Sequence, residues 1–110
     1  MTTNTLNGEA APTRRHQRDA TVVLLGLLAL DLPAAHWEVD ANPYQARLSG
    51  MASGFEPAAR TDVVRAWAAH LGVEPAYRSE GPGASGFFEA IATISDVHIR
   101  VWTVLTGGAA

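Results

Sequence analysis

The feature of this sequence that most constrains the fold is a pair of alternating runs, residues 87–94 and 97–105, separated by only Ser95 and Asp96. Two strand-forming runs joined this closely pair as an antiparallel hairpin. Counted outward from the turn, the pairs on one face are almost all apolar: Ile94 with Val97, Ala92 with Ile99, Ala90 with Val101 and Phe88 with Thr103. The other face carries the polar side chains: Thr93 with His98, Ile91 with Arg100, Glu89 with Trp102 and Phe87 with Val104. A slip of one residue would destroy this segregation, which predicts the register, although a slightly longer loop stays open because neither turn residue is Gly.

The first half of the chain predicts a helix over residues 13–30 that ends before Pro33. Its most apolar stripe has helical spacing and consists of Val23, Leu24, Leu27 and Leu28. Apolar residues also spread beyond this stripe. We therefore expect more than one face of the helix to be covered, either by the sheet or by a second copy of the chain.

Shorter patterns predict the remaining elements. Alternation predicts strands at residues 36–40 and 46–51, with a turn at Asn42-Pro43 between them. Spacings of three and four predict an amphipathic helix that Gly72 ends, built on Val63, Val64, Trp67, Ala68 and Leu71. A short strand at 76–79 then leads into a Gly- and Pro-rich loop at 80–86.

These elements predict an α+β fold in which an antiparallel sheet of about five strands carries two helices on one face. The expected element order is helix, strand, strand, helix, strand, strand, strand. We expect a disordered leader over residues 1–12, a single domain over 13–106 and a disordered tail over 107–110. A hint of internal repetition accompanies this order, because residues 30–35 before Trp37 parallel residues 71–76 before Tyr77.

Composition excludes several classes of function. The chain has no Cys, which removes thiolate chemistry, disulfides and Cys-based metal sites. Eight basic residues, all Arg, stand against eleven acidic ones, so nucleic acid is a disfavoured partner. The apolar run at 20–30 is too short to span a membrane. Asp19 and Asp31 bracket that run and make it a poor secretory signal, so we expect a cytoplasmic protein without a membrane partner, with secretion the less favoured alternative.

The polar face of the terminal hairpin is the candidate binding surface, formed by Glu89, His98, Arg100 and Trp102. Arg and Trp on a sheet face can stack on a nucleobase or bind a carboxylate. The competing interpretation is structural, because Glu89 can neutralise Arg100 and the guanidinium can lie over Trp102. The scarcity of basic charge favours the structural interpretation.

Other chemistry finds little support in the sequence. The four His residues fall on four different elements, so we expect no metal site. Gly81-Pro82-Gly83 lacks the Lys or the helix opening of a phosphate-binding loop, and we expect no cofactor. A small enzyme would need a cleft holding two of His36, Asp40, Glu89 and His98.

Four segments carry a resemblance: Leu-Asp-Leu-Pro-Ala-Ala-His-Trp at 30–37, Arg-Leu-Ser-Gly at 47–50, Val-Val-Arg-Ala-Trp-Ala-Ala-His-Leu-Gly at 63–72 and Val-His-Ile-Arg-Val-Trp at 97–102. In this general pattern the chain resembles small uncharacterised proteins of actinobacteria, encoded on chromosomes, plasmids or phages. The resemblance implies a cytoplasmic bacterial protein and offers no catalytic residue to transfer.

The leading hypothesis is therefore a non-catalytic interaction module that binds another protein or forms a homodimer through a sheet edge, a sheet face or the broad apolar surface of the first helix. A single-stranded nucleic-acid binder using Arg100 and Trp102 is the second hypothesis. A small enzyme is the third.

Overall fold

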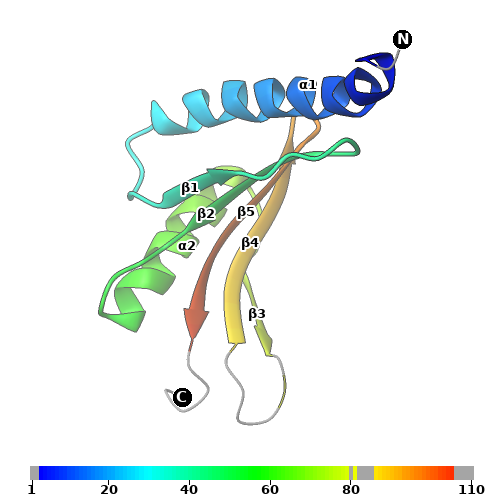
Figure 1. Cartoon of the computed structure of the whole chain (residues 1–110). Coiled ribbons are helices and arrows are strands. Elements are labelled where there is room, and N and C mark those ends of the chain that lie inside the picture. The colour runs from blue at the N-terminus through cyan, green and yellow to red at the C-terminus, as the bar shows by residue number, and fades with distance from the viewer. Residues whose placement is uncertain (1–2, 80, 82–85, 106–110) are drawn as a thin grey trace.

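The computed structural model describes residues 3–79, 81 and 86–105 as a five-stranded sheet with two helices (Figure 1). The helices are α1 (Thr3–Leu28) and α2 (Pro57–Leu71). The strands are β1 (His36–Val39), β2 (Ala46–Met51), β3 (Ala76–Ser79), β4 (Gly86–Ile94) and β5 (Val97–Leu105). The predicted tail at 107–110 and most of the Gly- and Pro-rich loop at 80–86 lie outside the described residues.

The terminal hairpin has the register that the sequence predicts. All eight predicted pairs between β4 and β5 are present, from Ile94 opposite Val97 to Phe87 opposite Val104. The connection is the two-residue turn, with Ser95 at φ 50° and Asp96 at φ 64°. Positive φ at both positions is what a type I′ turn requires, and this turn matches the twist of the strands that it joins.

The expectation of a wholly antiparallel sheet is wrong. The strand order across the sheet is β1-β2-β5-β4-β3, and the central pair β2 and β5 runs parallel, from Ala46 opposite Val97 to Met51 opposite Trp102. Between these two strands the chain passes through α2, which carries it to the far edge of the sheet. The strands β3, β4 and β5 then return inward, so that β5 closes on β2 in the same direction.

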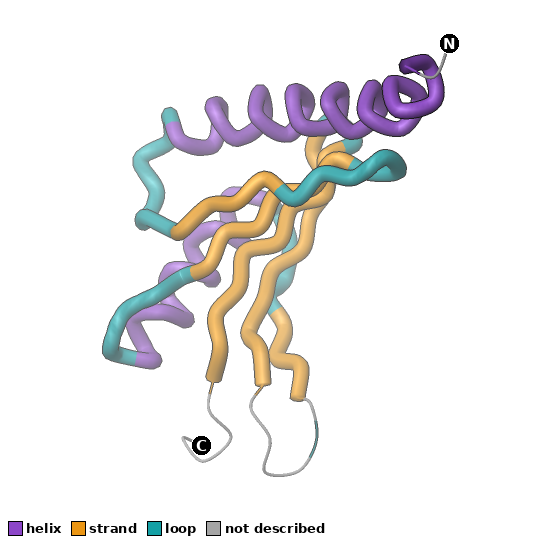
Figure 2. Tube along the Cα trace, in the orientation of Figure 1, coloured by secondary structure: helices purple, strands orange, loops and turns teal. Residues whose placement is uncertain are grey.

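Both helices contribute to one hydrophobic core on the sheet (Figure 2). Helix α1 packs mainly on β2 and β5, and α2 on β4 and β5. The fully buried side chains Leu48, Ile99 and Val101 point into this core from β2 and β5. Trp67 connects α2 to β1 and to the segment before it. Its ring packs edge-on against Trp37 with the ring centroids 5.2 Å apart, and its Nε1 donates to the Pro33 carbonyl at 2.8 Å.

Helix α1 begins at Thr3, well before the predicted start at residue 13, so residues 3–12 are helical where a disordered leader was expected. Extending an existing helix is far cheaper than nucleating one, so the packed second half can propagate toward the N-terminus through weak helix formers and Pro12. Helix α2 ends as predicted. Gly72 takes the left-handed conformation at φ 73°, and its N–H bonds the Ala69 carbonyl at 3.3 Å.

An aromatic ring covers a glycine at each side of the sheet. Trp37 on the edge strand β1 lies opposite Gly50 on β2, and Tyr77 on the edge strand β3 covers Gly86 on β4. Such pairing shields backbone that a glycine leaves bare. Both rings follow the segments in which the sequence hinted at a repeat.

The turn residues give a first test. Left-handed conformations cost a non-glycine residue roughly 1 kcal/mol or more, and Asn and Gly are the preferred residues of a type I′ turn. The double variant S95N/D96G should therefore raise the free energy of unfolding by about 1 kcal/mol in urea denaturation. Replacing the exposed helical Asp62 by Gly should instead lower it by up to about 1 kcal/mol. A destabilised S95N/D96G variant would contradict the assigned turn.

Two Gly-to-Ala substitutions give a second test with opposite signs. A Cβ at Gly50 would lie 2.8 Å from the Trp37 ring, so Gly50→Ala must displace that ring from Trp67 and should cost about 1–3 kcal/mol. A Cβ at Gly26 on α1 would meet nothing within 4 Å, so Gly26→Ala should stabilise by up to about 1 kcal/mol. Thermal unfolding of both variants at low protein concentration measures the difference.

Candidate functional site

The sheet face opposite the helices presents its side chains in rows across the strands. One row runs from His36 on β1 through Met51, Trp102 and Glu89 to Ala76 on β3. Of the residues predicted as a binding surface, Trp102 and Glu89 are therefore direct neighbours. Arg100 lies one row away and reaches Glu89 diagonally.

Glu89 is buried although none of the described helices covers its face of the sheet. It is 6% exposed, and its Oε1 lies 3.2 Å from Nη2 of Arg78 and 3.4 Å from Nη2 of Arg100. A carboxylate can stay charged out of water only where cations and hydrogen-bond donors replace its hydration. The two guanidinium groups provide this replacement.

Aromatic rings interleave with the two guanidinium groups. Arg100 lies over Trp102, with its Cζ at 4.7 Å from the ring centroid, and also over Phe87 at 5.3 Å. Arg78 meets the same Phe87 at 5.6 Å. The two rings touch edge-on at 5.8 Å, and Trp102 Nε1 donates to Ser49 Oγ at 2.8 Å. We call Arg78, Phe87, Glu89, Arg100 and Trp102 the sheet-face cluster.

The contacts in the sheet-face cluster are those expected if these residues stabilise the sheet rather than bind a ligand. Arg100 is paired with Glu89 and stacked on Trp102, so its charge and one of its faces are already engaged within the chain. His98 is not part of the cluster. It lies opposite Arg47 and Thr93, four residues before Trp102 on β5 and hence roughly 13 Å away along the strand.

Sequence reasoning missed three contributors, for different reasons. Phe87 was placed on the correct face, opposite Val104, but its contact with Trp102 is diagonal and depends on ring orientation. Ser49 and Arg78 come from β2 and β3. Their positions depend on the pairings of β2 with β5 and of β3 with β4, which no local pattern indicates.

The residues that a small enzyme would need are spread over the sheet. His36 and Glu89 share a row but are separated by two strands, and Asp40 is 3.8 Å from Nε of Arg47. His98 lies on β5, next to β2. Within residues 3–79, 81 and 86–105, no group of three His, Cys, Asp or Glu side chains could hold a metal ion.

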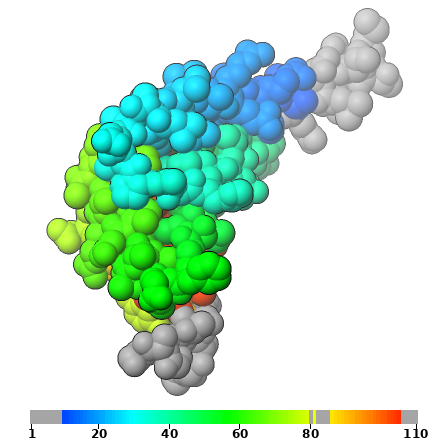
Figure 3. Space-filling model, turned by 90° about the vertical axis from the view of Figure 1, so that its left-hand side faces the viewer, coloured from blue at the N-terminus to red at the C-terminus, as the bar shows by residue number. Residues whose placement is uncertain are grey.

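A second surface lies on α1, on the side away from the sheet (Figure 3). Ala20, Val23, Leu24 and Leu27 pack into the core, yet Val22, Leu25 and Leu28 are 69%, 65% and 58% exposed. The outward positions alternate in spacings of four and three, as in a helix that pairs with another helix. We call these residues the outer seam of α1: Ala11, Arg15, Arg18, Val22, Leu25 and Ala29.

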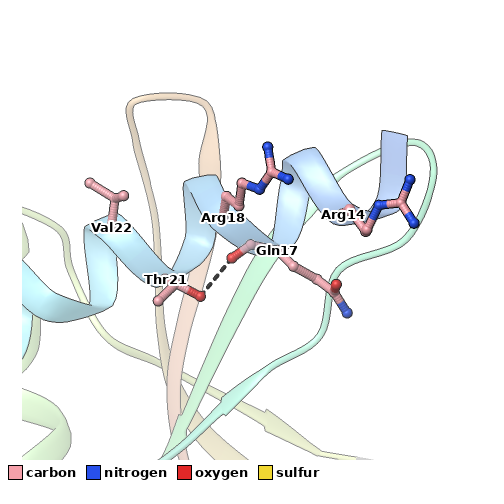
Figure 4. A pocket seen from close by; sticks show the side chains of 5 residues that line it. All are labelled: Arg14, Gln17, Arg18, Thr21 and Val22. Carbon is pink, nitrogen blue, oxygen red and sulfur yellow. Dashed lines mark hydrogen bonds between the residues drawn. The ribbon is translucent and has the colours of Figure 1, made fainter. Parts of the chain in front are cut away.

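A surface hollow of about 500 Å³ lies beside the outer seam, lined by Arg14, Gln17, Arg18, Thr21 and Val22. In Figure 4 the side chains of Arg18 and Val22 project to the same side of the helix. The Thr21 hydroxyl donates to the Gln17 carbonyl at 2.7 Å, so this polar group of the hollow is satisfied by the helix itself.

No helix in the described part of the chain is long and apolar enough to cross a membrane. Comparisons with protein-family models, with curated proteins and with solved structures found no match.

Removing the charge of Glu89 tests the sheet-face cluster. Glu89→Gln keeps the shape but leaves Arg78 and Arg100 without their shared carboxylate, so the variant should lose about 2 kcal/mol of unfolding free energy. Glu74→Gln is the matched control. That residue is exposed on the rim of the hollow that Arg78 and Glu89 also line, and its change should stay within about 0.5 kcal/mol. Equal effects in urea denaturation would show that the pairing contributes nothing.

Proposed function

We propose that this protein is a non-catalytic interaction module that self-associates through the outer seam of α1. The observation that carries the proposal is the exposure of Val22 and Leu25 in the outer seam, and of Leu28 beside it, on a helix whose other side is already packed in the core. Full burial of one such side chain contributes roughly 1.5–3 kcal/mol. Three of them left mostly in water are a substantial driving force for association.

A second copy is the partner that the pattern fits best. The seam spacing suits another helix, and exposed charges of opposite sign flank the apolar residues, with Arg14, Arg15 and Arg18 before them and Asp31 after the helix end. A symmetric pair can thus supply its own opposite charges. A foreign partner would have to bring matching acidic groups.

Single-stranded nucleic acid is the weaker candidate. Arg100 and Arg78 share the carboxylate of Glu89 and lie against aromatic rings, so binding a phosphate or a base would compete with contacts already made. The net charge of −3 also opposes accumulation on a polyanion. Catalysis is weaker still, because two strands separate His36 from Glu89, and Arg47, which is paired with Asp40, stands between Asp40 and His98.

A charge placed in the seam tests the proposal. Association must offset the loss of translational and rotational freedom, so we expect a dissociation constant of about micromolar or weaker. Sedimentation equilibrium over a concentration series should show the wild type rising above its monomer mass of 11.6 kDa, and Leu25→Glu staying at that mass. Ile91→Glu, which charges a 47% exposed apolar residue on the sheet face, should behave like the wild type.

Two results would refute self-association through α1: a wild type that stays monomeric at every concentration, or a Leu25→Glu variant that associates as the wild type does. Circular dichroism of both variants confirms that they fold. Because Leu25 is 65% exposed, its replacement should leave the fold intact.

A further inference from the structure

We infer that two copies of the chain pair their α1 helices antiparallel, with Leu28 of each copy packed into the hollow lined by Arg14, Gln17, Arg18 and Thr21 of the other. This inference rests on the proposed self-association and adds its orientation and register. On this inference, the arginines of α1 determine whether the two helices pair parallel or antiparallel.

Charge decides between the two orientations. Arg14, Arg15 and Arg18 are all exposed and all precede the apolar part of the seam. A parallel pair would place each of these arginines against its own copy, which repels. An antiparallel pair separates the two arginine groups and lays each one over the C-terminal end of the other helix.

The C-terminal end of α1 suits this contact. Its last turn contains no basic residue of its own, and the exposed Asp31 follows shortly after the helix ends at Leu28. The final carbonyl groups of a helix carry a partial negative charge that a nearby cation stabilises. Arginines from a second copy would meet both this partial charge and the Asp31 carboxylate.

Two pairs of residues in and just after α1 are spaced symmetrically about Val23. Arg18 and Leu28 each lie five residues from Val23, and Arg15 and Asp31 each lie eight residues from it. In a two-fold pair, a residue before the centre faces the residue equally far beyond it in the partner. One arrangement therefore brings Leu28 to the hollow at Arg18, and Asp31, three residues beyond the helix end, to the region of Arg15, twice in each dimer.

The hollow has the pattern of a hole for a helix knob. Four of its five lining residues, Arg14, Gln17, Arg18 and Thr21, have the spacing i, i+3, i+4 and i+7, and four residues in this spacing form the hole that receives one side chain from a facing helix (Figure 4). Leu28 lies seven residues beyond Thr21, on the same flank of the seam. A two-fold axis perpendicular to paired helices brings like flanks together, which places this 58% exposed Leu over the hole.

Charge reversal tests the orientation. We would measure the dissociation constant of Arg15→Glu, of Asp31→Arg and of the double variant by sedimentation equilibrium. Each single reversal creates two repulsive pairs in an antiparallel dimer and should weaken it about tenfold, and the double variant should return close to the wild type. Asp62→Arg, an exposed reversal on α2, should leave the constant unchanged. Unchanged constants in both single variants would overturn the antiparallel pairing.

Cysteine cross-linking gives an independent readout, because the chain contains no Cys. In an oxidising mixture, a tagged Arg15→Cys chain should form a disulfide with an untagged Asp31→Cys chain, and neither variant should link efficiently to itself. Self-linking of Arg15→Cys without the mixed product would establish a parallel pair and refute the inference. If the wild type never associates, the proposed function itself is refuted. The sedimentation series of the wild type and Leu25→Glu detects that outcome independently of the cross-linking.

Discussion

The fold depends on the position of β5 at the centre of the sheet. This strand pairs antiparallel with β4 on one side and parallel with β2 on the other, so it joins the two halves of the chain. Its inward side chains Val97, Ile99 and Val101 are completely buried, and both helices pack over them. Because side chains alternate along a strand, burying these residues fixes the outward direction of His98, Arg100 and Trp102. The position of β5 thus determines both the buried core on one face of the sheet and the sheet-face cluster on the other.

The outer face of the sheet shows how a charged group can be buried without a covering layer. Glu89 is shielded by two arginines whose flat guanidinium groups lie against Phe87 and Trp102. Each cation both neutralises the carboxylate and covers aromatic surface, so the polar and apolar contributions support each other. A stabilising role on an uncovered sheet face follows more directly from such an arrangement than ligand binding does.

Helix α1 differs from α2 in having apolar side chains on two sides. Its inner stripe packs on the sheet, whereas Val22, Leu25 and Leu28 remain exposed. The sheet covers only one side of this helix, so the second stripe is left in contact with water in the described structure. Its heptad-like spacing, its arginines and the hollow beside it are the features on which the proposed pairing rests. The proposed interface therefore lies on the layer opposite the sheet-face cluster.

Local sequence determined the parts of this protein that depend on neighbouring residues. The two-residue turn and the alternation of apolar side chains were enough to fix the β4–β5 register, the outward placement of Glu89, Arg100 and Trp102, and the end of α2 at Gly72. Tertiary structure alone decided the parallel pairing of β2 with β5 and the arrival of Arg78 beside Glu89. The physical reason is range. Turn geometry and side-chain alternation act over a few residues, whereas contacts between distant strands form only because the whole core gains free energy when they do.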